Sequence, residues 1–508
     1  MLAHLPHATT ALAGLAASFG PNRRGLPALP TRASEDHSEL MEHLTALDAS
    51  FLEVEDSDPH VNLAIASVSI MAGPVPQYDE LVAAFAERVR AIPRCTQVLH
   101  THPLDLGSPE WVGDAHFDIS HHVHRVALPE PGDDAQLFKM IATVMQHRLD
   151  RERPLWECWI IEGLTDNRWA ILMKLHHCIA DGIATTQMLA KLSDSGVGDT
   201  FAKSIRAAKE SDKPALRLLP ISMNPLTWVG GMWRTAVAGA NVAEHAAMGV
   251  AELTAGLLSS PPESSLSGPV TTMRRYAAAR VRLAEMQKVS RAFDVTLNDV
   301  ALTAITDSYR SLLLSRGEQP HHDSLRTLVP VSVRSMKDFQ RTDNRVSAML
   351  PLLPIDEADP VKQLELVHSR LMTAKSSGQR EGATALLAAV NSVPFTLSAW
   401  TMRMLTRLPQ HAVTALATNV PGPRSRQQLM GCEVLEILPV PPIALQLRTG
   451  IAMVSYADSF VFGITGDHDA APDLDQLAAG IEHAVARLVA LSRTRRRKGR
   501  RTKAVQSA

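Results

Sequence analysis

The pattern of apolar positions along the chain predicts an alternation of helices and strands. In residues 78–92, Leu81, Phe85 and Val89 recur every four positions, which predicts a helix with one buried face. Short continuous apolar runs instead predict buried strands, and they occur at residues 61–70, 155–161 and 169–175. The second half repeats the alternation, with helices from Met286 and at 296–314, then strands near 325–333, 346–353 and 452–466. This alternation is typical of the α/β class.

Length and composition indicate two folded domains rather than one. A chain of 508 residues exceeds the size at which a single hydrophobic core keeps growing. Its 45% hydrophobic and 20% charged residues are ordinary for a globular protein. The connection is expected between the polar stretch 193–212 and the Pro- and Ser-rich stretch 261–268. We therefore predict an N-terminal domain at 41–200, a partly helical linker at 201–270 and a C-terminal domain at 271–492.

The two ends of the chain differ from the body. The apolar run at 11–17 has no basic residue before it, and Arg23-Arg24 follows it, which is the wrong polarity for a secretory signal. For residues 1–40 we expect a disordered extension or a misassigned start, with organelle targeting as the alternative. Residues 493–503 hold 8 basic side chains and no acid, although the whole chain has a net charge of −2. We predict a disordered basic tail at 493–508.

The basic tail favours contact with anionic lipid at a membrane or a lipid droplet. A solvated end and a nucleic-acid tether are the alternatives, and the lack of aromatic residues among the charges disfavours nucleic acid. No segment reaches 18 consecutive apolar residues, so the sequence predicts no transmembrane helix. Polar residues interrupt the two nearest segments, and we expect core helices at 382–402 and an amphipathic linker or a membrane-touching face at 228–258.

One motif contains candidate catalytic residues. His176-His177-Cys178-Ile179-Ala180-Asp181-Gly182 has the spacing HHxxxDG, directly after the predicted strand 169–175 and before a predicted helix at 183–192. A histidine held in that turn can act as a general base, because a neutral imidazole can take the proton of an alcohol that attacks an acyl group. Two other His-His pairs, His121-His122 and His321-His322, lack the Asp-Gly that follows the first. The sequence therefore singles out the pair at 176.

Further segments make the chain resemble a known family. HHxxxDG resembles the signature of the CoA-dependent acyltransferase superfamily, which includes chloramphenicol acetyltransferase and peptide-synthetase condensation domains. The resemblance narrows to the bacterial wax ester synthase/diacylglycerol acyltransferase family through segments in the expected order: Leu47–Leu52, Pro154–Glu157, Asn298–Val300, Val329–Arg334, Asn419–Pro423, Ser455-Tyr456, Phe462-Gly463 and Asp467. The chain departs from the family at Thr418, which replaces a serine, and at 445–450, which replaces a Gly-Leu-Asn segment in one wall of the expected lipid site.

The resemblance implies a fold of two chloramphenicol-acetyltransferase-like domains with a tunnel between them and the histidine motif at its centre. A long-chain acyl-CoA would enter the tunnel from one side. The acceptor hydroxyl, on diacylglycerol or a fatty alcohol, would enter from the other. His177 would act as the general base, and its imidazolium would protonate the departing CoA thiolate. No cofactor is implied, because acyl-CoA is a substrate.

The other residues of this set are expected to support His177. Asp181 would organise the loop, and Gly182 would let the chain turn tightly. His176 is expected to be a packed, hydrogen-bonded neighbour rather than a second base. Asn298 fits two roles equally, as a donor to the tetrahedral oxyanion or as a helix N-cap.

The cysteines and remaining histidines indicate no metal site. The 4 cysteines form no CxxC pair, which disfavours a zinc site or a disulfide framework and is typical of a cytoplasmic protein. Cys178 lies inside the motif, but the family mechanism has no acyl-enzyme, so a structural role is expected. The cluster of His121, His122 and His124 is interpreted as solvated or structural.

The resemblance thus implies an O-acyltransferase that acts on diacylglycerol and also on fatty alcohols. It is expected in the cytoplasm or peripherally at the inner membrane or a lipid droplet. Two other functions stay open. One is an acyltransferase of the same superfamily with a glycolipid or polyketide acceptor. The other is a lipid-binding protein without catalysis, against which the intact His177, Asp181, Gly182 and Asn298 argue.

Overall fold

The computed structural model describes most of the chain between Glu42 and Gln506. The described residues are 42–102, 108–180, 185, 188, 191–194, 264–332, 346–376, 413–444 and 446–506. Several predictions lie outside them: the extension at 1–40, most of the linker at 201–270, the segments 228–258 and 382–402, and most of the helix at 183–192.

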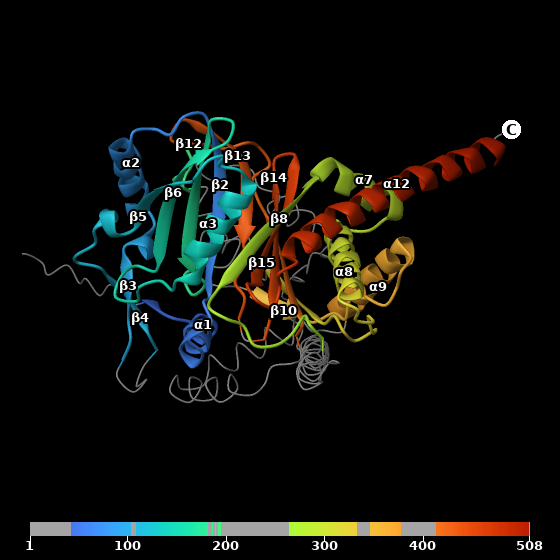
Figure 1. Ribbon diagram of the computed structural model, residues 1–508, viewed down its shortest axis with the longest axis horizontal. Helices are drawn as coiled ribbons and strands as arrows, with labels where there is room; N and C mark the ends of the chain where they lie inside the picture. The colour runs from blue at the N-terminus through green and yellow to red at the C-terminus, as the bar shows by residue number, and fades with distance from the viewer. Residues whose placement is uncertain are drawn as a thin grey trace, which may run out of the picture. The chain divides into compact units, whose positions relative to one another are not determined.

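A six-stranded sheet forms the frame of the first half (Figure 1). Its strands from this half are β2 (Ala64–Ala72), β5 (Val123–Ala127), β6 (Trp156–Leu164) and β7 (Arg168–His176). β2, β7 and β6 are antiparallel neighbours, and β5 runs parallel to β6 at the edge. The strand pair predicted at 155–161 and 169–175 is confirmed, and β2 begins and ends slightly later than predicted.

Helices and a small sheet complete the first half. They are α1 (Ala46–Ser57), α2 (Tyr78–Arg90), α3 (Asp134–Gln146), the short helices η1 (Pro93–Cys95) and η3 (Ile119–His121), and a sheet of β1 (Glu42–His43), β4 (Glu110–Gly113) and β3 (Gln97–His100). α2 buries Leu81, Phe85 and Val89, as the spacing predicts. α3 begins with a capping box in which Asp133 and Gln136 each accept a hydrogen bond from the other's backbone N–H.

A second six-stranded sheet organises the other half, in the order β10-β9-β11-β14-β15-β8. Its strands are β8 (Arg274–Arg282), β9 (Thr327–Ser332), β10 (Val346–Met349), β11 (Ala415–Pro421), β14 (Thr449–Tyr456) and β15 (Ser459–Asp467). Among the described residues of this half, the helices are α7 (Leu283–Phe293), α8 (Leu297–Ser315), α9 (Pro360–Ser376) and α12 (Leu474–Gln506). α8 is buried along most of its length, because α7, α9 and α12 all pack against it.

One segment of the second half belongs to the first sheet. β12 (Gln428–Leu429) and β13 (Cys432–Val440) follow β11 in the chain, yet β13 pairs antiparallel with β2 (Figure 1). Leu438 faces Val68 across this pair, and both are buried in the first core. A segment within the predicted C-terminal domain 271–492 therefore adds a strand to the sheet of the first half. Strand pairing decides which core a residue joins, and a local pattern does not encode the pairing partner.

Close backbone contact holds this crossing segment against the second sheet. Tyr276 on β8 donates a hydrogen bond from its hydroxyl to the Pro439 carbonyl of β13 at 3.0 Å. The same carbonyl lies over Gly463 of β15, where any Cβ would collide with it. A glycine at 463 therefore lets the two sheets approach each other at this point.

The C-terminal segment differs from the prediction. α12 continues unbroken to Gln506, whereas a disordered tail was expected from residue 493. Arg, Lys and Ala are strong helix formers, and a helix that has already been nucleated by buried Leu477 and Ile481 extends at little cost. Among the helices that the structure describes, none is long and apolar enough to span a membrane.

Candidate active site

His176 is the last residue of β7, and its side chain closes the turn that follows. The imidazole is buried, and its Nδ1 accepts a hydrogen bond from the Cys178 backbone N–H at 3.2 Å. Its Nε2 lies 3.4 Å from Oε2 of Glu55 on α1. Because Nδ1 accepts, the proton of the neutral ring belongs on Nε2, where it faces a carboxylate. His176 is thus buried, and its ring is held by a hydrogen bond within the turn.

His177 occupies the first position of the turn. Its backbone N–H donates to the Leu63 carbonyl at 3.1 Å, which ties the turn to the segment that enters β2. Its ring stacks on Phe51 of α1, with centroids 4.4 Å apart and planes inclined by 30°. The residue is half-buried, in contrast to the buried His176. Asp181 and Gly182, the other predicted residues of the motif, lie outside the described residues.

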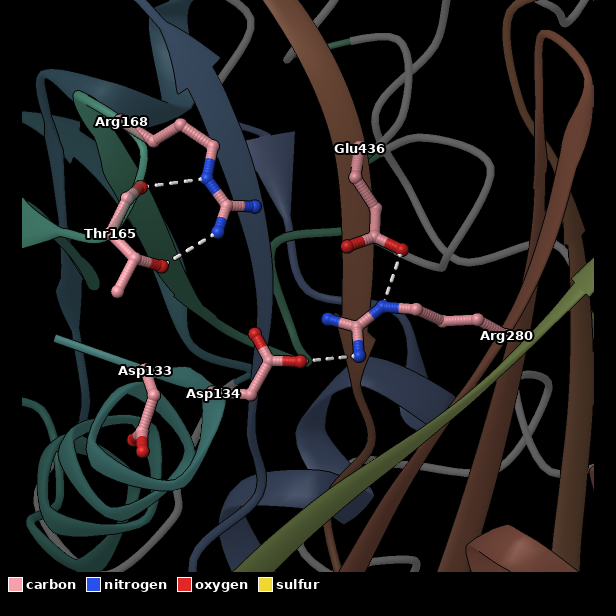
Figure 2. A pocket seen from close by; sticks show the side chains of 6 residues that line it. All are labelled: Asp133, Asp134, Thr165, Arg168, Arg280 and Glu436. Atoms are coloured by element: carbon pink, nitrogen blue, oxygen red, sulfur yellow. Dashed lines mark hydrogen bonds and ion pairs between the residues drawn. The ribbon is translucent and has the colours of Figure 1, made fainter. Parts of the chain in front are cut away.

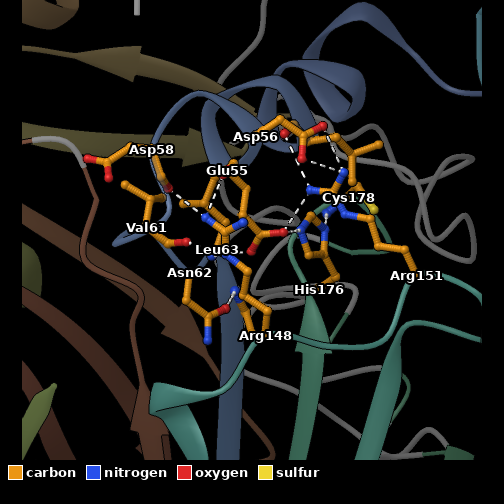
Figure 3. Close-up of polar contacts among 12 residues, drawn as sticks. Glu55, Asp56, Asp58, Val61, Asn62, Leu63, Arg148, Arg151, His176 and Cys178 are labelled. Atoms are coloured by element: carbon orange, nitrogen blue, oxygen red, sulfur yellow. Dashed lines mark hydrogen bonds and ion pairs between the residues drawn. The ribbon is translucent and has the colours of Figure 1, made fainter. Parts of the chain in front are cut away.

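Glu55 is the anionic centre of the contacts around this turn (Figure 3). Its Oε1 accepts from the Leu63 N–H at 3.1 Å, and its Oε2 accepts from Nη2 of Arg151 at 2.8 Å. Burial by itself raises the pKa of Glu55. The contacts with His176, Arg151 and the Leu63 N–H outweigh burial and lower the pKa to about 2. The carboxylate is therefore ionised throughout the physiological range, although its side chain is only 2% exposed.

The loop after α3 connects α3 with α1 beside the turn. Arg148 donates to the Val61 carbonyl at 2.9 Å and to the Glu55 and Asp58 carbonyls at 2.5 Å each (Figure 3). Asn62 donates from its amide to two carbonyls at the end of α3, those of Met145 and His147. Backbone that is bound on both sides in this way offers His177 a support of fixed geometry.

A buried lysine binds carbonyl groups at the C-terminus of α3. Lys174, two residues before His176 on β7, donates from Nζ to the Val144 carbonyl at 3.1 Å and to the His147 carbonyl at 2.7 Å. Burial lowers the pKa of Lys174, and Glu157 on the neighbouring strand counters part of this effect. A cation at the C-terminus of α3 satisfies carbonyls that have no partner within the helix. Lys174 thereby fixes α3 to the strand that carries the motif.

Asn298 lies in the first turn of α8, but it is not the N-cap. Thr296 is the N-cap, and its hydroxyl accepts from the Asp299 N–H while the Asp299 carboxylate accepts from the Thr296 N–H. The N-cap interpretation of Asn298 is therefore wrong. Its Oδ1 instead accepts a hydrogen bond from Nδ2 of Asn419 on β11 at 3.4 Å. This orientation directs the NH₂ of Asn298 away from Asn419, so it can act as a donor.

The contacts of Cys178 and His122 are structural. Cys178 is buried, and desolvation raises the pKa of its thiol well above the ordinary value, which disfavours a thiolate nucleophile. His122 is stacked between Phe117 and Trp156, and its Nδ1 lies 2.8 Å from the Trp156 carbonyl. Among the described residues, no group of three or more His, Cys, Asp or Glu side chains is arranged to hold a metal ion.

A polar pocket of about 610 Å³ lies where the two sheets meet (Figure 2). Its lining residues are Asp133, Asp134, Thr165, Arg168, Arg280 and Glu436. Arg280 of β8 donates to Glu436 of β13 at 2.7 Å and to Asp134 of α3 at 2.6 Å. The guanidinium is thus already neutralised by carboxylates from the other sheet and its helix. This cluster joins the two halves and contains none of the predicted site residues.

The sequence interpretation missed Glu55, although one signal could have found it. Phe51 belongs to the Leu47–Leu52 segment, and Glu55 lies one helical turn further on. Residues four apart share one face of a helix. An acid on the same face as an apolar family segment is buried with it, and a buried acid needs partners. Arg151 offered no comparable signal, because it lies in a run of charged residues.

Two α/β halves, each organised by a six-stranded sheet, with the histidine turn at the end of β7, make up a fold that is similar to those of two kinds of solved structure. The wax ester synthase/diacylglycerol acyltransferase from Marinobacter aquaeolei VT8 is similar in structure, with a TM-score of 0.63 and 24% identity over 89% of this chain and 100% of that chain. The starter condensation domain of rhizomide synthetase is similar with a TM-score of 0.57 and 13% identity, over 89% of this chain and 95% of that chain. At these identities, both similarities show the fold alone.

The chain belongs to the wax ester synthase/diacylglycerol acyltransferase family. Residues 44–301 match the catalytic domain of that family, and residues 342–488 match its C-terminal domain. A protein of Mycobacterium tuberculosis named as a probable diacylglycerol O-acyltransferase is 52% identical over 456 residues. That alignment covers 90% of this chain and 97% of its relative. The resemblance stated from the sequence is confirmed, and the chain is an acyltransferase.

Proposed function

We propose that the protein transfers a long-chain acyl group from acyl-CoA to the hydroxyl of diacylglycerol, with fatty alcohols as further acceptors. The observation that carries this proposal is the position of His177, whose backbone is bound to Leu63 and whose ring is stacked on Phe51. A base held in this way needs little reorganisation before reaction. The M. tuberculosis relative, named for transfer to diacylglycerol, supports the choice of acceptor.

His177 would act twice in the reaction. Its imidazole takes the hydroxyl proton of the acceptor as the acceptor oxygen attacks the thioester carbonyl. When the tetrahedral intermediate collapses, the carbon–sulfur bond breaks, and the imidazolium returns that proton to the CoA thiolate. The ester and free CoA leave, and the base is neutral again. General base catalysis of this kind typically contributes about 10²–10⁴ in rate.

Asn298 is our candidate donor to the oxyanion of the intermediate. Its Oδ1 is occupied by Asn419, so the NH₂ group is the part of the amide that remains to donate. An amide donates without titrating, which keeps the donor constant over the working pH range. Loss of one oxyanion donor typically costs about 10²–10³ in rate. Asp181 and Gly182 would shape the loop that follows His177.

The proposal is tested by a product assay on the purified full-length protein. Labelled palmitoyl-CoA is supplied with equal amounts of diacylglycerol and hexadecanol, and the lipid products are separated. We expect labelled triacylglycerol in excess over wax ester from the wild type. His177→Ala should lower the rate by about 10²–10⁴. His121→Ala is the matched control, because His121 is an exposed histidine outside the motif, and its loss should leave the rate unchanged.

Either of two results would reject this function. If a folded wild-type protein formed no ester with either acceptor, the substrate class would be wrong, and a glycolipid or polyketide acceptor would be tested next. If His177→Ala retained the wild-type rate, the base would have to be another residue. An excess of wax ester over triacylglycerol would leave the acyl-transfer mechanism in place but show that the fatty alcohol is the preferred acceptor.

We further propose that the basic end of α12 contacts anionic lipid. Residues 493–503 hold 8 basic side chains and no acid, and the helix extends through them. Each basic residue near an anionic surface typically contributes about 1 kcal/mol. In sedimentation with vesicles, binding should require anionic lipid and weaken as salt rises. A variant with 496–501 changed to Gln at every Arg and Lys should lose it. Equal binding to neutral vesicles would reject an electrostatic contact.

A further inference from the structure

We propose that Glu55 is the positioning residue for His177, an inference that rests on the function proposed above. Glu55 lies on α1, far from the motif in the chain, and it reaches the turn by two separate routes (Figure 3). One route passes through the side chain of His176, and the other passes through the backbone of Leu63. Both end at the short stretch of backbone that presents His177.

The first route fixes the hydrogen-bonding state of His176. A carboxylate can only accept, so Glu55 holds the His176 proton on Nε2, where the two atoms are 3.4 Å apart. Nδ1 then carries a lone pair, which accepts the Cys178 N–H at 3.2 Å. That bond closes the turn around His177. If the proton moved to Nδ1, the Cys178 N–H would meet another donor, and the turn would have to open.

The second route fixes the backbone on the other side. Glu55 accepts from the Leu63 N–H at 3.1 Å, and the Leu63 carbonyl accepts from the His177 N–H at 3.1 Å. The backbone N–H and carbonyl of Leu63 therefore connect the Glu55 carboxylate to the backbone N–H of His177. Phe51, one helical turn before Glu55, stacks on the His177 ring at 4.4 Å. A single face of α1 thus contacts both the ring and its supports.

Arg151 allows the carboxylate to stay ionised in this buried place. It contacts Glu55 through Nη2 at 2.8 Å and Asp56 through Nη1 at 2.8 Å. Asp56 is 53% exposed and shares only the arginine with this cluster, so it separates two explanations. If Glu55 served merely to neutralise Arg151, Asp56 would be comparable to it. If Glu55 positions His177, the two acids differ sharply in their effect on turnover.

The experiment compares Glu55→Gln with Asp56→Asn in the full-length protein, using palmitoyl-CoA and the acceptor preferred in the product assay. A carboxamide keeps the size of Glu55 but replaces one acceptor oxygen with a donor. We expect Glu55→Gln to lower kcat roughly 10- to 100-fold, because small misplacement of a catalytic group has costs of this size. KM for acyl-CoA should stay within about twofold, and Asp56→Asn should change kcat less than about threefold.

A double-mutant cycle tests whether Glu55 acts through His176. In a His176→Asn background, the Asn oxygen can still accept the Cys178 N–H, but the link to Glu55 is gone. Adding Glu55→Gln there should lower kcat far less than it does in the wild type. A full additive loss would overturn the route through His176. A Glu55→Gln protein with a kcat within threefold of the wild type, or with a kcat no lower than that of Asp56→Asn, would overturn the proposal.

Hydrogen exchange gives a readout that needs no activity. The amides of His177 and Cys178 depend on the two routes, so their exchange should accelerate roughly tenfold or more in Glu55→Gln and stay unchanged in Asp56→Asn. Unchanged exchange in Glu55→Gln would reject the positioning role even if kcat fell. If instead the wild type formed no ester, the proposed function would fail, and the exchange data would still decide how Glu55 acts on the turn.

Discussion

Two ion-pair clusters in this protein use the same side-chain chemistry for different purposes. The cluster at the histidine turn centres on Glu55, which is 2% exposed and meets Arg151, His176 and a backbone N–H. The cluster between the sheets centres on Arg280 and includes Asp134, which is 47% exposed. A buried charge needs a partner, and removing one member of a buried ion pair greatly lowers the stability of the fold. Exposed pairs contribute little to stability and tolerate change. The two clusters therefore differ in burial: the buried Glu55 cluster supports the histidine turn, and the less buried Arg280 cluster joins the two halves.

The largest effect should come from removing the buried anion. Glu55→Ala takes the buried carboxylate away from the Leu63 N–H and the His176 imidazole, and leaves Asp56 as the acid that contacts Arg151. Breaking one side of a buried pair typically costs about 3–5 kcal/mol. Urea denaturation followed by circular dichroism should show a fall of this size in the free energy of unfolding. A loss below about 1 kcal/mol would mean that water replaces the carboxylate and that the site is less enclosed than its burial indicates.

The second effect is a dependence of stability on pH. The folded pKa of Glu55 lies at about 2, below the ordinary 4.5. The carboxylate therefore stabilises the fold above pH 4.5, and its contribution is lost as pH falls from 4.5 towards 2. The full contribution corresponds to about 3 kcal/mol. The difference in unfolding free energy between wild type and Glu55→Gln should shrink across this window. A constant difference would show that Glu55 does not titrate there.

A smaller effect is expected at the half-buried cluster around Arg280. Arg280→Met removes both ion pairs with Asp134 and Glu436 but keeps the aliphatic packing of the side chain. Pairs of this exposure typically contribute up to about 1 kcal/mol. The melting temperature should fall slightly, and the acyl transfer rate should stay near the wild-type value. A large loss of activity would instead assign this cluster a role in placing the two halves for catalysis.

The smallest effect should be that of Asp56→Asn. This acid contacts the same arginine as Glu55, yet it is exposed to solvent. We expect a change in unfolding free energy of about 0.5 kcal/mol or less, which salt would screen further. Denaturation at low and high ionic strength measures both quantities. If Asp56→Asn lowered the free energy of unfolding as much as Glu55→Ala does, burial would not distinguish the two acids.

Local patterns in the sequence predicted most of the strands and helices that carry the site. The apolar runs at 155–161 and 169–175 became β6 and β7, because a buried strand needs a continuous apolar segment and the chain offers one at each place. The position of the motif at the end of β7 followed directly. β13 was not assigned to its sheet, since its own residues do not show which strand edge they will meet.

The supports of the site were harder to predict than its motif. Glu53, Glu55 and Asp56 lie within one turn of α1 and look alike in the sequence, but only the fold shows that Glu55 faces Leu63 and His176. The N-cap of α8 could have been found, because Thr296 and Asp299 have the spacing of a capping box. Residues that hold others in place carry no signature of their own, since their partners come from distant parts of the chain.

The crossing of β13 into the first sheet has a consequence for synthesis on the ribosome. β2 lies inside the finished sheet, between β7 and β13, but its partner on one side is encoded more than three hundred residues later. Until Val440 has emerged, one edge of β2 stays open and can pair with another chain. The first half therefore cannot reach its final form alone. A gene cut between the halves should yield an N-terminal fragment that aggregates unless the segment 428–440 is supplied with it.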